Sequence, residues 1–322
     1  MKQLNLILPG LIWPNAADYE YLSSRIKLPQ LSNLFAKGKL SRLELNVSDF
    51  VYAEQLSSGL NLADYYAQKL GLNAHVAYML LEPTHLRLDR DRLLISEPAL
   101  LQLNSAEAQQ LIAEINEYFS GELEVFYISD ELWLIGLNFA LDAVVSYPLI
   151  DIVGENIDEF LPSGNERLRL HKLINEMQML LFNLPLNKLR EDEGLLSINS
   201  VWIWNKSPAK FAFEFGTRLA NNSSLSALTD DFAAVTSLIV DKAYYPACYR
   251  DSFSWLEVVA ELDGLLATKL LDLLLSRKIQ RLNIYVPTLT GCHCLQLSRF
   301  DLWKFWRKKA FLWYELAEEL AE

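Results

Sequence analysis

The sequence predicts an α/β protein, with a mostly parallel sheet flanked by helices and interrupted by a small α+β insertion. Apolar stretches of strand length alternate with stretches of helical period along most of the chain, which is typical of a parallel sheet. Between residues 84 and 162 the pattern changes to short strands joined by polar turns, which is typical of antiparallel pairing. With 322 residues, the chain is long enough to bury roughly three quarters of its unfolded surface.

The first part of the chain has the order strand, helix, strand that begins an α/β domain. Continuous apolar runs indicate buried strands, and helical spacing followed by glycine indicates where helices end. The predicted elements are a strand over residues 3–8, a helix over 28–37, a strand over 40–46, a helix over 61–70 and a strand over 76–81.

Two hairpins and a helix make up the predicted insertion. Residues 85–88 and 92–95 flank a polar turn, as do residues 123–128 and 132–137. Between the hairpins, a helix begins near Ser105, a residue type favoured as an N-cap. We therefore assign residues 83–163 to the insertion and residues 1–82 and 164–322 to the core, with a hinge over 161–164.

The rest of the chain is predicted to complete the core. Apolar residues at helical spacing indicate a helix over residues 166–182. Residues 199–205 are apolar on both sides, which predicts a central strand of the main sheet. A strand over 253–262, a helix over 263–275, a strand over 280–286 and an aromatic helix near 302–320 follow.

Composition and charge exclude several classes of protein. A hydrophobic content of 51% excludes disorder, and the apolar runs fall short of a bilayer span. The net charge of −12 predicts a surface that repels nucleic acid and anionic membranes. The run over residues 4–13 is interrupted by Pro9 and Gly10 and is interpreted as a strand, not a signal peptide. Three cysteines form no paired framework, so we expect a reducing cytoplasm.

The stretch from Leu184 to Pro208 carries most of the candidate ligand-binding residues. Asn187, Arg190 and Asn199 are polar residues placed shortly before or at the start of a predicted buried strand. Arg190 has the planar fork that binds phosphate or carboxylate, but its acidic neighbours at 191–193 also permit a surface ion pair, which we favour.

The remaining candidate ligand-binding residues are two tryptophans of the predicted strand and two polar residues of a predicted helix. Trp202 and Trp204 point to the same face of their strand; packing in the core is favoured over stacking on a ligand. His171 and Gln178, with Asn175 between them, lie on one side of the helix over 166–182. They either line a pocket or form a solvated face, and we favour the solvated face.

This stretch resembles a motif of the archaeal-type cofactor-independent phosphoglycerate mutases, which belong to the alkaline phosphatase superfamily. That motif is His-Pro-Val-Asn, then Arg, Gly and Asn, then Trp-x-Trp-Gly. The chain departs from it at Leu184, where the family has His, and at Asn205, where it has Gly. The matching positions are Pro185, Asn187, Arg190, Gly194, Asn199, Trp202 and Trp204.

Two weaker passages are similar to the same scaffold. Residues 28–38 are similar to a helix of the superfamily, and residues 82–87 with 303–307 resemble a bacterial branch called RpfE-type regulatory proteins. The resemblance implies an alkaline-phosphatase-like core with helices on both faces of a sheet. It also implies a role in bacterial regulation.

The resemblance would further imply a two-metal site with a Ser or Thr nucleophile, and the sequence lacks its ligands. Where the superfamily has an Asp-Gly after the first strand, this chain has Pro9 and Gly10, and an expected Asp-His pair is replaced by residues 287–291. Neither Ser57 nor the Cys292-His293-Cys294 run offers a convincing substitute. We therefore predict no catalytic residue, no metal and no cofactor.

The sequence thus favours a catalytically degenerate phosphoglycerate mutase-like protein that acts as a binding or regulatory module. The expected partner is either a phosphorylated or anionic small molecule or a protein. The alternative is a metal-dependent phosphomutase or phosphatase with a rearranged site built from Asp241, Asp263 or His293. A purely structural partner protein is a third hypothesis, and it predicts no pocket near Asn187 and Arg190.

Overall fold

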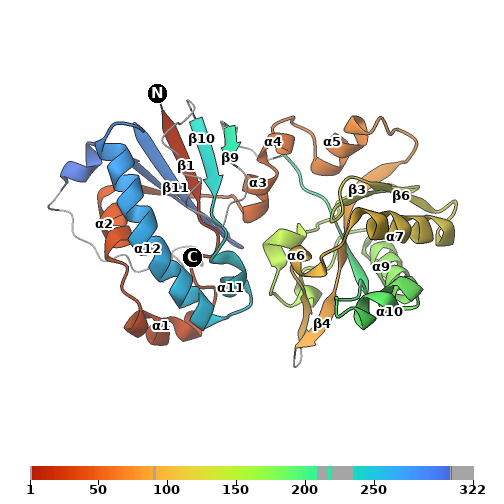
Figure 1. Cartoon of the computed structure of the whole chain (residues 1–322). Helices are drawn as coiled ribbons and strands as arrows, with labels where there is room; N and C mark the ends of the chain where they lie inside the picture. Colours follow the sequence, from red (N-terminus) through yellow and green to blue (C-terminus); the bar gives the residue numbers. More distant parts are fainter. Residues whose placement is uncertain (1, 90–91, 209–216, 220–234, 305, 307–322) are drawn as a thin grey trace. The chain divides into compact units, whose positions relative to one another are not determined.

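The computed structural model describes residues 2–89, 92–208, 217–219, 235–304 and 306 (Figure 1). The chain forms two compact units. Unit 1 consists of Met1–Val51 and Ala212–Glu322, and unit 2 consists of Tyr52–Phe211. Each unit has its own sheet and its own apolar core. No helix in the described part of the chain is long and apolar enough to cross a membrane.

Unit 1 contains a six-stranded sheet with the order β2-β12-β11-β1-β10-β9. The four strands from β11 to β9 run parallel, and β12 and β2 are added antiparallel at one edge. The strands are β1 (Gln3–Ile7), β2 (Lys39–Leu43), β9 (Thr217–Leu219), β10 (Val235–Ile239), β11 (Arg281–Thr288) and β12 (Gly291–Ser298). The predicted α/β class with a mostly parallel sheet is therefore confirmed.

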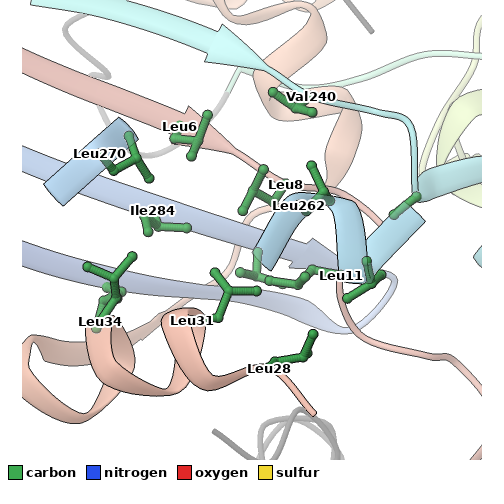
Figure 2. Packing of buried hydrophobic residues seen from close by; sticks show 14 of the residues in the cluster. Leu6, Leu8, Leu11, Leu28, Leu31, Leu34, Val240, Leu262, Leu270 and Ile284 are labelled. Atoms are coloured by element: carbon green, nitrogen blue, oxygen red, sulfur yellow. The ribbon is translucent and has the colours of Figure 1, made fainter. Parts of the chain in front are cut away.

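Alternate residues of these strands make one face of the sheet almost purely aliphatic. Leu6 of β1 and Ile284 of β11 lie on this face, together with Leu8 and Val240 just beyond the strand ends (Figure 2). Residues from the helices pack against them, including Leu31 and Leu34 of α2. The elements of unit 1 outside the sheet are η1 (Ala16–Asp18), α1 (Tyr19–Arg25), α2 (Pro29–Lys37), α3 (Val47–Val51), α11 (Tyr244–Cys248), α12 (Ser252–Leu275) and η4 (Asp301–Trp303).

Unit 2 contains a fully antiparallel four-stranded sheet with the order β6-β7-β3-β8, and a separate two-stranded hairpin, β4-β5. The strands are β3 (Ala77–Thr84), β4 (Leu86–Asp89), β5 (Arg92–Ile95), β6 (Leu123–Tyr127), β7 (Trp133–Leu137) and β8 (Ser200–Trp204). One face of the larger sheet forms a core with α7 (Ser105–Tyr118) and α9 (Arg167–Phe182). The other helices are α4 (Ala53–Leu56), α5 (Leu62–Lys69), α6 (Pro98–Leu101), α8 (Leu149–Ile152), η2 (Ile157–Glu159) and α10 (Pro185–Asp192).

The placement of β8 differs from the prediction of a central strand in the main sheet. It is an edge strand of the sheet in unit 2, paired with β3. It is apolar on both sides because Val201 and Ile203 face the core with α9, while Trp202 and Trp204 are buried on the opposite face. Since β3 and β8 both join the strands of the predicted insertion, unit 2 begins at Tyr52 and not at residue 83.

Two further elements also differ from the expectation, and a third is not tested. Residues 253–262, predicted as a strand, lie within α12, because Trp255, Val259 and Leu262 recur at helical spacing and pack into the core. The predicted hinge over 161–164 lies inside unit 2, where Ser163 bridges Val145. Most of the predicted closing helix over 302–320 lies outside the described residues.

Candidate functional site

Asn187 uses its whole side-chain amide to hold the segment that leads into β8. Its Nδ2 donates to the carbonyls of Leu181 and Ile198, at 2.7 and 2.8 Å. Its Oδ1 accepts the backbone N–H of Ile198 at 2.7 Å. With 5% of its surface exposed, Asn187 connects the end of α9 to the chain before β8.

Arg190 is buried in the same way, with 1% of its surface exposed. Its Nη1 donates to Oε1 of Glu107 at 2.6 Å, its Nε donates to the Leu196 carbonyl at 2.9 Å, and its Nη2 donates to the Leu101 carbonyl. The ion pair is therefore made with Glu107 of α7 and not with the acidic residues at 191–193. Glu107 also accepts the backbone N–H of Asn104 in a capping box, so Arg190 ties the start of α7 to α10.

Trp202, Trp204 and His171 are likewise engaged by neighbouring groups. The indole N–H of Trp202 donates to the Tyr147 carbonyl at 2.8 Å, and that of Trp204 donates to Oε1 of Glu82 at 2.6 Å. The two tryptophans are at most 2% exposed. Nε2 of His171 lies 2.7 Å from the Pro162 carbonyl. These contacts agree with packing roles for the two tryptophans, whereas His171 is half-buried.

Glu82 is a buried carboxyl group of unit 2 whose acidity is strongly changed by its surroundings. Burial raises its pKa from 4.5 to about 8, against the opposing effect of the Trp204 N–H. Nearby negative charges on Glu131 and Asp151 push the pKa in the same direction as burial. The ring of Tyr52 lies 5.5 Å from that of Trp204, and burial and the Glu82 charge raise the pKa of its phenol. At neutral pH Glu82 is therefore mostly a neutral acid.

Gln178 and Asn199 are the predicted candidates that line a groove. The groove lies within unit 2 between α9 and the β4-β5 hairpin and has a volume of about 630 Å³. Asn175, which the sequence placed beside Gln178, also lines it. The remaining lining residues are Leu86, Leu93, Met179, Phe182 and Asn183, so none of the described lining residues is charged.

Three of the four amides in the groove, those of Gln178, Asn183 and Asn199, make hydrogen bonds. Oδ1 of Asn199 accepts the backbone N–H of Leu86 at 2.7 Å, and its Nδ2 donates to the Leu86 carbonyl at 2.9 Å. Nε2 of Gln178 donates to the hydroxyl of Ser200 at 2.9 Å. The groove is thus a preformed surface of amides and aliphatic or aromatic side chains. The contribution of β4 could not be predicted from the sequence, because that contact joins segments 113 residues apart.

The carboxyl end of β1 in unit 1 is the place where the resemblance would put a metal ligand. Pro9 and Gly10 occupy it, followed by Leu11 and Trp13, and all four are buried. The indole N–H of Trp255 donates to the Gly10 carbonyl at 2.7 Å. The loop that follows this strand is therefore packed into the core of unit 1.

Asp263 and His293, two of the residues considered for a rearranged metal site, are buried in unit 1. The carboxylate of Asp263 accepts the backbone N–H groups of Gln30 and Leu31, at 3.3 and 2.7 Å, and so caps the start of α2. His293 lies on β12 opposite Val286 and is 2% exposed. Among the described residues, no three His, Cys, Asp or Glu side chains are grouped so as to hold a metal ion.

Substitution of Gly10 tests how tightly the loop after β1 is packed. A Cβ atom there would lie 2.4 Å from the Ala243 carbonyl oxygen and 2.5 Å from the Tyr244 Cα, and Gly10 has a φ of +77°. We expect Gly10→Ala to lower the free energy of unfolding by about 2–4 kcal/mol, because it adds backbone strain to a clash with backbone atoms. Urea denaturation followed by circular dichroism measures the change.

Gly59 provides the matched control. It has a φ of +80°, but nothing lies within 4 Å of its Cβ position. Gly59→Ala therefore adds only the backbone strain, which costs about 1 kcal/mol. Equal losses for the two variants would contradict the close packing at Gly10.

Comparison with known proteins gives weak but consistent matches. No family model matches the chain. It is 27% identical to a 2,3-bisphosphoglycerate-independent phosphoglycerate mutase of Methanosarcina mazei, over 62% of this chain and 55% of that protein. It is 31% identical to a probable enzyme of the same name from Geobacter sulfurreducens, over 39% of this chain and 33% of that protein. The matches therefore span about half or less of the relatives' own length.

Solved structures add little to this relationship. A cofactor-independent phosphoglycerate mutase from Thermoplasma acidophilum aligns over 92% of this chain and 90% of its own, with 14% identity and a TM-score of 0.35. Over the matched part, the chain is a distant relative of proteins with this mutase name.

Proposed function

We propose that this distant relative of the phosphoglycerate mutases is a binding or regulatory module that has lost metal-dependent phosphoryl transfer. The supporting observation is the packing beyond β1, where Pro9 replaces the expected Asp and the Gly10 carbonyl accepts the Trp255 N–H. A proline side chain offers no ligand atom, and a metal site requires several hard ligands close together. The loop at this position stabilises unit 1 instead.

The alternative of a rearranged phosphomutase or phosphatase site has less support. Asp263 is committed to the amides at the start of α2, so recruiting it as a ligand would uncap that helix. Asp241 follows β10, and its side chain is neither fully buried nor placed with two other ligands among the described residues. A metal-dependent phosphomutase or phosphatase is therefore the second hypothesis.

The groove in unit 2 is the proposed binding surface. Its described lining is uncharged, so it offers no cation to a phosphorylated or anionic small molecule. Amides together with exposed aliphatic and aromatic side chains suit a protein partner better. The three cysteines are unpaired, which supports a cytoplasmic location.

Turnover measurements test the proposal against the enzyme hypothesis. The purified full chain is incubated with 3-phosphoglycerate, and separately with p-nitrophenyl phosphate, after loading with Mn²⁺, Mg²⁺ or Zn²⁺. We expect no turnover above that of the metal ion alone, and no stoichiometric metal after dialysis.

Metal-dependent turnover that chelation abolishes would overturn the proposal. Asp241→Ala is the informative variant in that case, because Asp241 is one of the residues of the rearranged site and its side chain is not fully buried. Asn187→Ala is unsuitable as a probe of catalysis. It would remove three hydrogen bonds that hold the chain before β8 and would lower activity by unfolding alone.

A further inference from the structure

The β4-β5 hairpin of unit 2 has an outer edge whose hydrogen-bonding groups can be assigned from its register. The Ser96 N–H donates to the His85 carbonyl at 3.0 Å, which makes these residues a hydrogen-bonded pair. Such pairs alternate with non-hydrogen-bonded pairs along an antiparallel ladder. Leu86 and Ile95, and then Leu88 and Leu93, are therefore non-hydrogen-bonded pairs. The backbone N–H and C=O groups of Leu86 and Leu88 point away from β5.

The first of these two outward-facing positions is already filled by an amide. Asn199 accepts the N–H of Leu86 and donates to its C=O, at 2.7 and 2.9 Å. A neighbouring strand would make the same two bonds to one residue of an edge. The side chain of Asn199 thus stands in for a single residue of a third strand.

The second position is unfilled among the described residues. Leu88 is 75% exposed, and no hydrogen bond from the described part of the chain reaches its outward N–H or C=O group. An exposed strand edge of this kind is a template for pairing with another extended chain. Leu88 therefore offers one donor and one acceptor at the spacing that an added strand requires.

The groove beside this edge provides contacts for side chains. Met179 and Phe182 of α9 line it with 69% and 79% of their surface exposed, and Leu86 and Leu93 line it from the hairpin. Exposed apolar side chains of this size gathered around a groove are characteristic of interaction sites. Asn175 also lines the groove, and its amide has no hydrogen-bond partner among the described residues.

We propose that an extended polypeptide segment of a partner protein adds to the outer edge of β4 beyond Asn199, with uncharged, mainly apolar side chains in the groove. The backbone of the segment pairs with the N–H and C=O of Leu88, and its side chains contact Phe182 and Met179. Strand addition of this kind takes affinity from main-chain bonds and specificity from side-chain pockets. The proposal names the partner class for the binding module and rests on that proposed function.

A library of random ten-residue peptides displayed on phage tests the proposal with the full chain as bait. Selected peptides are synthesised with a fluorescent label, and their dissociation constants are measured by fluorescence polarisation. We expect alternating apolar residues in the selected sequences, because successive side chains of a strand point to opposite faces.

Three variants define where the peptides bind. Leu88→Pro removes the outward N–H without removing a bond to β5, and proline is tolerated on a strand edge. Phe182→Ser removes the largest apolar side chain of the groove. We expect each to weaken binding at least about tenfold. Leu168→Ser is the matched control, because Leu168 lies on the same helix and is 74% exposed but does not line the groove.

Unchanged melting temperatures confirm that the variants fold. Failure to select any peptide, or equal affinity for wild type and Leu88→Pro, would overturn the proposal. Concentration-dependent dimerisation lost in Leu88→Pro would identify a second copy as the occupant and would also overturn it. Metal-dependent phosphoglycerate turnover would refute the proposed function but leave the binding result unchanged, so the two failures are distinguishable.

Discussion

Replacing Arg190 by methionine is expected to lower the free energy of unfolding by about 3–5 kcal/mol. The substitution leaves the Glu107 carboxylate without its 2.6 Å partner and deprives the Leu101 and Leu196 carbonyls of a donor. Removing one member of a buried ion pair costs more than the net value of the pair, because the remaining charge stays in a poorly solvated site. Urea denaturation at neutral pH gives the value.

Two further variants isolate the cause of this loss. Lys188→Met removes an exposed cation from the same helix and should change stability by no more than about 0.5 kcal/mol. Adding Glu107→Gln to Arg190→Met should recover part of the loss, because it removes the unpaired charge. A loss below about 1 kcal/mol for Arg190→Met would show that its bonds do not hold α7 to α10.

The stability of the protein is expected to fall as the pH rises from about 4.5 to about 8, and Glu82 is the cause. Burial raises its folded-state pKa to about 8 from 4.5, so in this range the folded state binds a proton that the unfolded state has released. Stability is therefore highest below pH 4.5 for this group and declines until the folded pKa is passed. The full effect is about 5 kcal/mol, taking 1.36 kcal/mol for each pKa unit.

The variant Glu82→Gln should remove this dependence, because the amide is neutral and its oxygen still accepts the Trp204 N–H. The unfolding free energies of Glu82→Gln and wild type are measured between pH 5 and 9 and subtracted. Groups that titrate equally in both proteins then contribute nothing to the difference. The groups facing Glu82 are Tyr52, Asp151 and Glu131. Glu131→Gln, at an exposed position, should retain most of the pH dependence. Parallel curves for wild type and Glu82→Gln would contradict a protonated Glu82.

Much of the local structure followed from the sequence. Both predicted hairpins of unit 2 are present, as β4-β5 and β6-β7, because their strands flank short polar turns. The helices predicted from Ser105 and over residues 166–182 also match α7 and α9 closely. Periodicity predicted these elements well, since each depends on neighbours within a few residues.

One long apolar run was predicted as a strand but forms part of a helix. Residues 253–262 belong to α12, although the run resembles a buried strand. A short apolar run fits both a buried strand and a buried helix, and only its packing partners separate them. β8 was placed in the centre of the main sheet for a different reason, namely that it is apolar on both sides, which also fits an edge strand buried on both faces.

The sequence by itself determined the α/β class, most of the local elements and the proline at position 9, because each is written in residue identity or short-range spacing. Only the tertiary structure decided which sheet β8 joins, that Arg190 pairs with Glu107, and that Asn199 fills the edge of β4. Glu107 is 83 residues from Arg190, and Leu86 is 113 residues from Asn199. Such partners are selected by packing and hydrogen bonding between distant segments, which no local pattern records.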